Sequence, residues 1–220
     1  MTNRRHTIGF TLIELALVAV IVGVLATLSI AATRQAVGSL KTAGCLDNLR
    51  QWGLATQFYT MDNNAMLPRE GSPNGASRRY AWYVSLPPYL DLEPYHEQPW
   101  RTNPKARPSR SGWICPTNKR RSNGANLFHY CLNGHVDGRG DNDLPTQIHA
   151  YARPQRLVWL YDNGGLAAVA GRNNAHTNLH RGGAHFGLLD GSVRHHTAAD
   201  YMNTKTDAMA RAEPVLQWVP

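Results

Sequence analysis

The chain has 220 residues and a formal net charge of +8, from 23 lysine and arginine against 15 aspartate and glutamate residues. With an N-terminal helix set aside, this length allows one modest globular domain. The basic residues are scattered, apart from a denser patch at Lys119-Arg120-Arg121, and lack the aromatic-and-basic pattern of a nucleic-acid-binding protein, so a nucleic-acid partner is disfavoured.

The first predicted element is an apolar run over residues 10–32, in which Glu14 is the only charged residue. About 20 apolar residues in a helix cross the hydrocarbon core of a bilayer, so this run predicts a membrane-spanning helix. A charge inside hydrocarbon costs roughly 2.5–3.5 kcal/mol on insertion scales. Glu14 therefore needs a partner, and an ammonium group at Phe10 would supply one if the chain were cleaved after Gly9.

Two arginines, Arg4 and Arg5, precede the apolar run. The positive-inside rule then keeps the N-terminus cytoplasmic and exports the C-terminal part of the chain. An exported domain meets conditions that permit disulfides. The sequence has three cysteines, Cys45, Cys115 and Cys131, so at most one pair forms within the chain.

The helix is predicted to continue beyond the apolar run, because no proline occurs before Pro68 and mostly apolar residues recur at three- and four-residue spacing. We expect one helix from about Phe10 to about Asp62, roughly 75 Å long at 1.5 Å per residue. Its second half would be the spine of the globular domain. The recurring residues are Val37, Leu40, Gly44, Cys45, Asn48, Leu49, Trp52, Ala55 and Tyr59.

Short strands and turns are predicted for the rest of the chain, after a helical turn within residues 82–90. Strand candidates are residues 113–116, 127–132 and 157–161, and then a hairpin of 185–189 and 192–196. Asp190-Gly191 between the last two suits a two-residue type I′ turn. The sum predicts an α+β domain, with a long helix packed on a small antiparallel sheet.

The segment Gly9-Phe10-Thr11-Leu12-Ile13-Glu14 after a short basic leader resembles the processing site of type IV prepilins and type II secretion pseudopilins. The resemblance implies a pilin-like fold, and cleavage between Gly9 and Phe10 by a prepilin peptidase that also N-methylates Phe10. It implies that Glu14 pairs with the Phe10 amine of a neighbouring subunit. The implied parts are a leader (1–9), a membrane and assembly helix (10–32) and a periplasmic head (33–220) on a single-pass inner-membrane protein.

Later segments are similar to a bacterial subfamily of pseudopilin-like proteins. The similarity includes Cys45 on the helix, Cys115-Pro116, and a closing signature of a histidine, nine residues and Asp-Gly, here His180 and Asp190-Gly191. His185 stands where the subfamily pattern usually has asparagine, and Cys131 is an additional thiol. The subfamily pattern places cysteines at both Cys45 and Cys115.

Two disulfide pairings compete, and both use Cys115. A bond to Cys131 would close a short loop, whereas a bond to Cys45 would tie the helix to the sheet across a long loop, which gains more on the chain-entropy model. We favour Cys45–Cys115, because it joins the two elements that most need joining.

Two groups of residues are candidates for metal sites. The histidines His176, His180, His185, His195 and His196 have no helix signal and no nearby Cys or Glu to complete a set, so no catalytic metal is expected there. His180 is instead expected to hydrogen-bond the Asp-Gly hairpin. The acidic loop with Asp137, Asp141 and Asp143 offers oxygens for calcium but lacks the closing glutamate of an EF-hand.

The sequence thus predicts a structural subunit rather than an enzyme: a pseudopilin or minor pilin that assembles with other subunits into a secretion pseudopilus or pilus-like filament. A minor pilin whose basic head binds DNA or another surface is the alternative. A membrane-anchored enzyme is a third class, for which the sequence shows no nucleophile elbow, phosphate loop or paired-carboxylate cleft.

Overall fold

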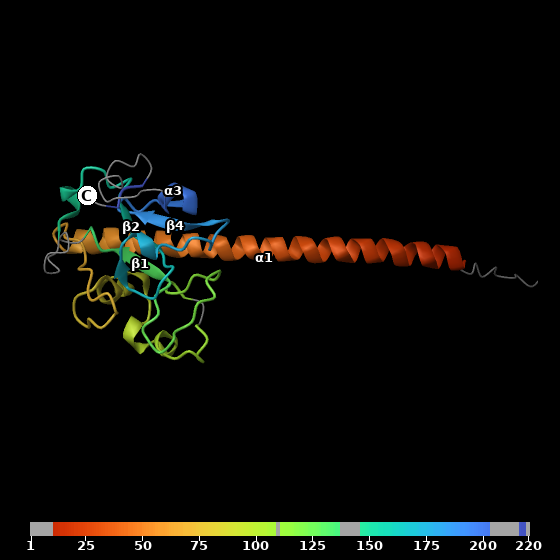
Figure 1. Ribbon diagram of the computed structural model, residues 1–220, viewed down its shortest axis with the longest axis horizontal. Helices are drawn as coiled ribbons and strands as arrows, with labels where there is room; N and C mark the ends of the chain where they lie inside the picture. The colour runs from red at the N-terminus through yellow and green to blue at the C-terminus, as the bar shows by residue number, and fades with distance from the viewer. Residues whose placement is uncertain (1–10, 109–110, 137–145, 203–215, 219–220) are drawn as a thin grey trace, which may run out of the picture. The chain divides into compact units, whose positions relative to one another are not determined.

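A computed structural model describes residues 11–108, 111–136, 146–202 and 216–218. The chain divides into two compact units, Met1–Leu40 and Lys41–Pro220. The expected α+β layout is confirmed: a long N-terminal helix is followed by a five-stranded sheet (Figure 1). The helices are α1 (Leu12–Asp62), α2 (Trp82–Ser85) and α3 (Ala198–Met202), and the strands are β1 (Tyr130–Asn133), β2 (Val158–Asp162), β3 (Val169–Ala170), β4 (Gly183–Leu188) and β5 (Val193–Thr197).

The first part of α1 forms the N-terminal unit and buries nothing within the chain. Every described side chain from Thr11 to Leu40 is exposed, although most of them are apolar. By length and composition, this is the one helix of the described residues that could cross a membrane. A helix that is apolar on all sides normally lies in a membrane or in a larger assembly, because apolar surface is driven out of water.

The second part of α1 belongs to the head and packs on one side. Its buried positions recur at helical spacing: Cys45, Leu49, Trp52, Gly53, Ala55, Thr56 and Thr60. Val37 and Leu40, which we expected in the same stripe, are exposed, so the buried stripe starts only at Cys45. The helix ends at Asp62, as predicted, because Asn64 and Ala65 adopt left-handed backbone conformations that break the helical path.

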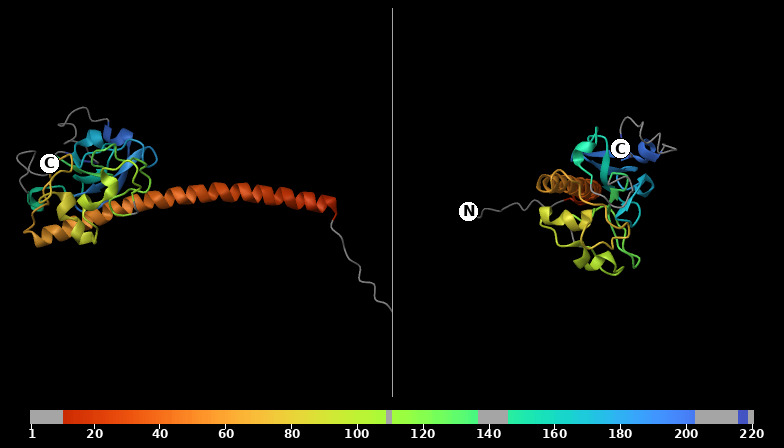
Figure 2. Two further views of the ribbon diagram at one scale, coloured as in Figure 1. Left: turned by 90° about the horizontal axis from the view of Figure 1, so that it is seen from below. Right: turned by 90° about the vertical axis from the view of Figure 1, so that its left-hand side faces the viewer.

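The sheet has the strand order β3-β1-β2-β4-β5. Neighbouring strands pair antiparallel, except β1 and β3, which are parallel. The sheet is therefore mixed, whereas we expected a purely antiparallel one. The parallel strand β3 has only two residues, too few to show an alternating pattern. In Figures 1 and 2, β2 and β4 lie beside the later turns of α1, and α3 lies beside the sheet.

Two local predictions are wrong. Residues 113–116 form no strand, because their backbone groups bond locally and to α1: Ile114 N–H donates to Ser111, and the Ile114 carbonyl accepts from the Asn48 side chain. The β4–β5 turn is not type I′, since Asp190 has no positive φ. Gly191, whose φ is +86°, donates its N–H to the Leu188 carbonyl. The Leu188 N–H donates to the Ser192 carbonyl, and these bonds close a three-residue loop.

Aromatic side chains fill the core between α1 and the loops that precede β1. The Trp52 ring lies 5.4 Å from that of Trp82 and 4.8 Å from that of Trp113, between ring centroids. Tyr95 and Phe128 stack with centroids 4.1 Å apart. The segment of about residues 70–125 is therefore held by large buried rings although it contains little regular structure.

Candidate functional site

The predicted site residues fall into three groups in the structure. Gly9 and Phe10 of the expected cleavage site, and Asp137, Asp141 and Asp143 of the expected calcium loop, lie outside the described residues. Glu14 lies at the start of α1. The remaining candidates, which are the cysteines and the residues of the closing signature, lie in the head.

Glu14 and Thr11 form a capping box at the start of α1. The Glu14 Oε2 atom accepts from the Thr11 backbone N–H (2.9 Å) and hydroxyl (2.8 Å), and Glu14 N–H donates back to Thr11 Oγ1 (3.3 Å). Thr-x-x-Glu before an apolar run is the sequence signature of this motif, because both side chains satisfy backbone N–H groups that lack helical partners. Our sequence reasoning assigned Glu14 only an assembly role and missed this local one.

A disulfide links Cys45 of α1 to Cys115, with the Cα atoms 4.6 Å apart. Of the two pairings that the sequence left open, this is the one that ties the helix to a distant part of the chain. Cys131, on β1, is a free thiol and fully buried, and burial raises its pKa to about 12. A thiol that stays protonated in this way is a poor nucleophile.

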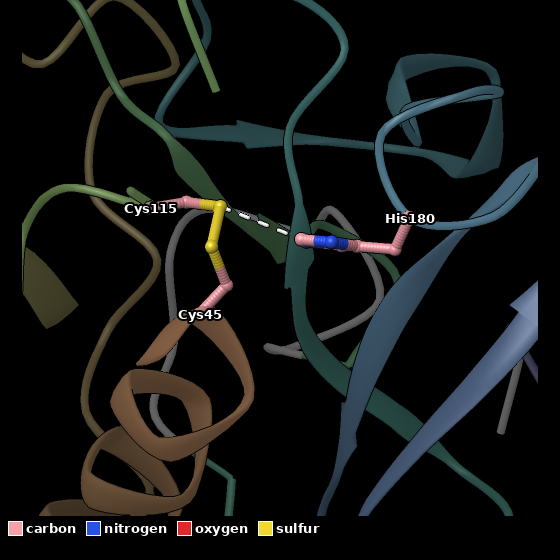
Figure 3. Close-up of side chains that lie close together, drawn as sticks. All are labelled: Cys45, Cys115 and His180. Atoms are coloured by element: carbon pink, nitrogen blue, oxygen red, sulfur yellow. Dashed lines mark hydrogen bonds between the residues drawn. A yellow bond between two sulfur atoms is a disulfide. The ribbon is translucent and has the colours of Figure 1, made fainter. Parts of the chain in front are cut away.

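His180 points at this disulfide. Its Nε2 atom lies 3.6 Å from the Cys115 sulfur, and Figure 3 shows the imidazole approaching from the loop before β4 while Cys45 comes from the helix. The backbone of His180 bonds reciprocally with Gly183, around a tight turn in which Arg181 and Gly182 have positive φ. This turn places the His180 side chain over the end of β2.

The residue at the end of that strand is Asp162, the last residue of β2, and it completes a buried cluster. Its Oδ2 atom lies 3.2 Å from His180 Nε2 and 3.4 Å from His185 Nδ1, and accepts from the His185 backbone N–H at 2.8 Å. The His180 and His185 rings stack with centroids 4.1 Å apart. The exposed fractions of the three side chains are 0% for Asp162 and His180 and 3% for His185.

The two imidazoles decide the ionisation of Asp162. Complete burial acts to raise the pKa of this carboxyl group, but the interactions with His180 and His185 outweigh burial and hold the pKa below its ordinary value. A buried carboxylate is therefore present at neutral pH. Such a charge is stable only where partners surround it, and here they come from two further segments of the chain.

The expected hydrogen bond between His180 and the Asp-Gly hairpin is present, but it uses the backbone of His180, whose carbonyl oxygen lies 2.6 Å from His195 Nε2 on β5. Asp190 Oδ1 accepts from the backbone and hydroxyl of Ser192, while the described contacts of the His180 side chain are with Cys115, Asp162 and the His185 ring. The turn after His180 sends this side chain toward the end of β2 and not toward Asp190. The two halves of the His-nine-residues-Asp-Gly signature therefore have separate roles.

The cluster also changes our view of the histidines as metal ligands. No third ligand lies close to the histidines along the chain, but the fold brings Asp162 to His180 and His185, with the ligand atoms within 4.8 Å of one another. The signal that could have found Asp162 was its position as an acidic residue directly after the apolar segment 157–161. His176, His195 and His196 are in neither of the two ligand groups found among the described residues.

Comparison with known proteins adds no relative: no protein-family model, curated protein or solved structure matches the chain.

Proposed function

We propose that the protein is a pilin-like or pseudopilin-like subunit that is cleaved after Gly9, is held in the inner membrane by the first part of α1, and assembles through this segment with other subunits into a filament. The proposal starts from the exposure of every described side chain from Thr11 to Leu40 on a mostly apolar helix, and Glu14 carries it from a membrane anchor to a subunit. An apolar surface of this extent must be shielded from water by lipid or by other protein.

Two environments can cover the apolar surface of this helix, one after the other: the bilayer and the filament. Before assembly the hydrocarbon core of the bilayer covers it, since about 20 apolar residues match its thickness. After assembly the equivalent helices of neighbouring subunits cover it. A membrane anchor alone would need only the first cover, so the apolar helix is compatible with both a plain anchor and a subunit, and Glu14 favours the subunit.

Glu14 is an ionisable residue among apolar ones, and its described bonds go only to Thr11. Among the described residues, no cationic side chain forms an ion pair with it. Carboxylates inside membrane segments are rare and usually have a functional partner. A free Phe10 amine on a neighbouring subunit, produced by cleavage after Gly9, is a partner of the right charge and depth.

Mass spectrometry of the N-terminus tests the proposal. The full chain is expressed with a prepilin peptidase, and the membrane-extracted protein is expected to begin at a methylated Phe10. Gly9→Val should remain uncleaved, because the peptidase site accepts glycine and not a bulky side chain. An intact Met1 in the wild type, in cells where a known prepilin is cleaved, would contradict the proposal.

A further inference from the structure

The cluster of Asp162, His180 and His185 in the head has no part in the proposed assembly through α1. We propose that these three residues form a buried binding site for one transition-metal dication, with Zn²⁺ as the best-fitting ion. The ligand atoms would be Asp162 Oδ2, His180 Nε2 and His185 Nδ1. The proposal follows from the geometry, the donor chemistry and the unsatisfied atoms of the cluster, one after another.

Two of the three spacings within the cluster are those of ligand atoms in a tetrahedral metal site. Zn²⁺ binds nitrogen and oxygen at about 2.0–2.1 Å, so ligand atoms at tetrahedral angles lie about 3.3 Å apart. Asp162 Oδ2 lies 3.2 Å from His180 Nε2 and 3.4 Å from His185 Nδ1. The His180 and His185 rings now stack with centroids 4.1 Å apart, so the rings would turn until both nitrogen atoms face the cation.

The donor chemistry is that of a borderline metal. Two imidazoles and one carboxylate suit Zn²⁺ and similar first-row dications, whereas Ca²⁺ and Mg²⁺ prefer sites made of oxygen.

Unsatisfied polar atoms are the independent observation. Asp162 Oδ1 and His185 Nδ1 are buried and have no hydrogen-bond partner, a condition that costs about 1–3 kcal/mol for a typical buried polar group. A cation between the three side chains gives His185 Nδ1 a direct partner and lies within reach of the second carboxylate oxygen. His180 Nδ1, which is also unsatisfied, would then carry the proton of a ring whose other nitrogen binds the metal.

The fold holds the ligands before any metal arrives. Asp162 and His185 lie on adjacent strands, and the His185 backbone N–H donates to the carboxylate that would bind the metal. The disulfide beside His180 fixes the other side. It also removes a competing site, because Cys45, Cys115 and His180 form a second potential ligand set whose sulfurs are poor ligands while they are bonded to each other.

Metal titration of the oxidised full-length chain tests the proposal. The protein is purified in detergent without a histidine tag, stripped with a chelator, checked for its intact disulfide and titrated with Zn²⁺ and Co²⁺. We expect one Zn²⁺ per chain, a higher melting temperature, and the visible absorption of a low-symmetry Co²⁺ site. Asp162→Asn and His185→Gln should each weaken Zn²⁺ binding at least 100-fold, and the matched control His149→Gln, at an exposed histidine, should not change it.

X-ray absorption of the Zn²⁺-loaded wild type keeps the test decisive if the variants fold poorly. We expect two imidazoles around the metal, with nitrogen and oxygen as the only donor atoms and no sulfur. Absence of a stoichiometric Zn²⁺ site in the wild type would overturn the proposal, and so would unchanged binding in both folded variants. Sulfur ligands would overturn it as well, because they would assign the metal to the cysteines.

Discussion

Gly53 on α1 lies directly against Gly191 in the β4–β5 turn. A Cβ atom at Gly53 would be 3.0 Å from the Gly191 Cα atom and 3.1 Å from its carbonyl oxygen. One turn further along the helix, Gln57 Nε2 donates to the Leu189 carbonyl at 3.0 Å. The Asp-Gly part of the closing signature therefore docks the hairpin on the helix through backbone contact.

Gly53→Val is expected to destabilise the head. The new side chain would meet the backbone of Gly191, which cannot move aside like a flexible side chain, and overpacking of this kind costs about 1–3 kcal/mol. Gly38→Val is the matched control, because a Cβ there has nothing within 4 Å and both sites are helical. Chemical denaturation compares the two, and equal stability of the two variants would contradict the contact.

The Cys45–Cys115 disulfide joins parts of the chain that are 70 positions apart. Replacing both cysteines by alanine should lower the free energy of unfolding by about 4 kcal/mol, because the unfolded chain regains the freedom that the long loop had lost. Thiol titration gives a direct check. The denatured, unreduced wild type should show one reactive thiol, from Cys131, and three thiols would contradict the bond.

The sequence was sufficient for the elements that depend on patterns along the chain. The long helix and its end at Asp62 follow from apolar spacing and turn-forming residues, and β2 from a β-branched and aromatic run with turn residues at its ends. The parallel strand β3 could not be found in this way. Its two residues gain their structure from pairing with β1, which is a tertiary interaction.

The candidate site in the head was predictable only in part. His180 and His185 stood out in the sequence, but the direction of a side chain depends on the backbone turn beside it, and the left-handed Arg181-Gly182 turn directs the His180 side chain toward the end of β2. Asp162 reaches the histidines only because β2 and β4 are neighbours in the sheet. Neither strand pairing nor turn geometry can be read from the histidine spacing.

Two substitutions of Glu14 separate its local role from the proposed pairing. Glu14→Gln keeps an oxygen that can accept from Thr11, as glutamine does in capping boxes, but removes the charge. Glu14→Ala removes both, and loss of a cap typically costs about 1 kcal/mol. We expect both variants to be cleaved and both to be poorly incorporated into sheared filaments. Normal incorporation of Glu14→Gln would assign Glu14 to capping alone.

His129 predicts how the stability of the head depends on pH. Its side chain is buried, with Nε2 3.3 Å from the Arg120 carbonyl oxygen, and burial lowers its pKa to about 4. An unfolded histidine titrates near pH 6.5, so between about pH 6.5 and 4 the unfolded chain binds the proton more readily. Neutral His129 therefore contributes to the free energy of unfolding, on the order of 3 kcal/mol in total. This contribution is complete above pH 6.5 and is lost as the pH falls to about 4.

His129→Gln should flatten this dependence, because glutamine does not titrate and is short enough to fit beside the Arg120 carbonyl. Chemical denaturation at several values from pH 7 to pH 4 measures it, with His149→Gln at an exposed position as the matched control. A smaller slope should remain, since burial also lowers the pKa values of His96, His176 and His196. If His129→Gln and the control lose stability equally as the pH falls, protonation of His129 is not what destabilises the head.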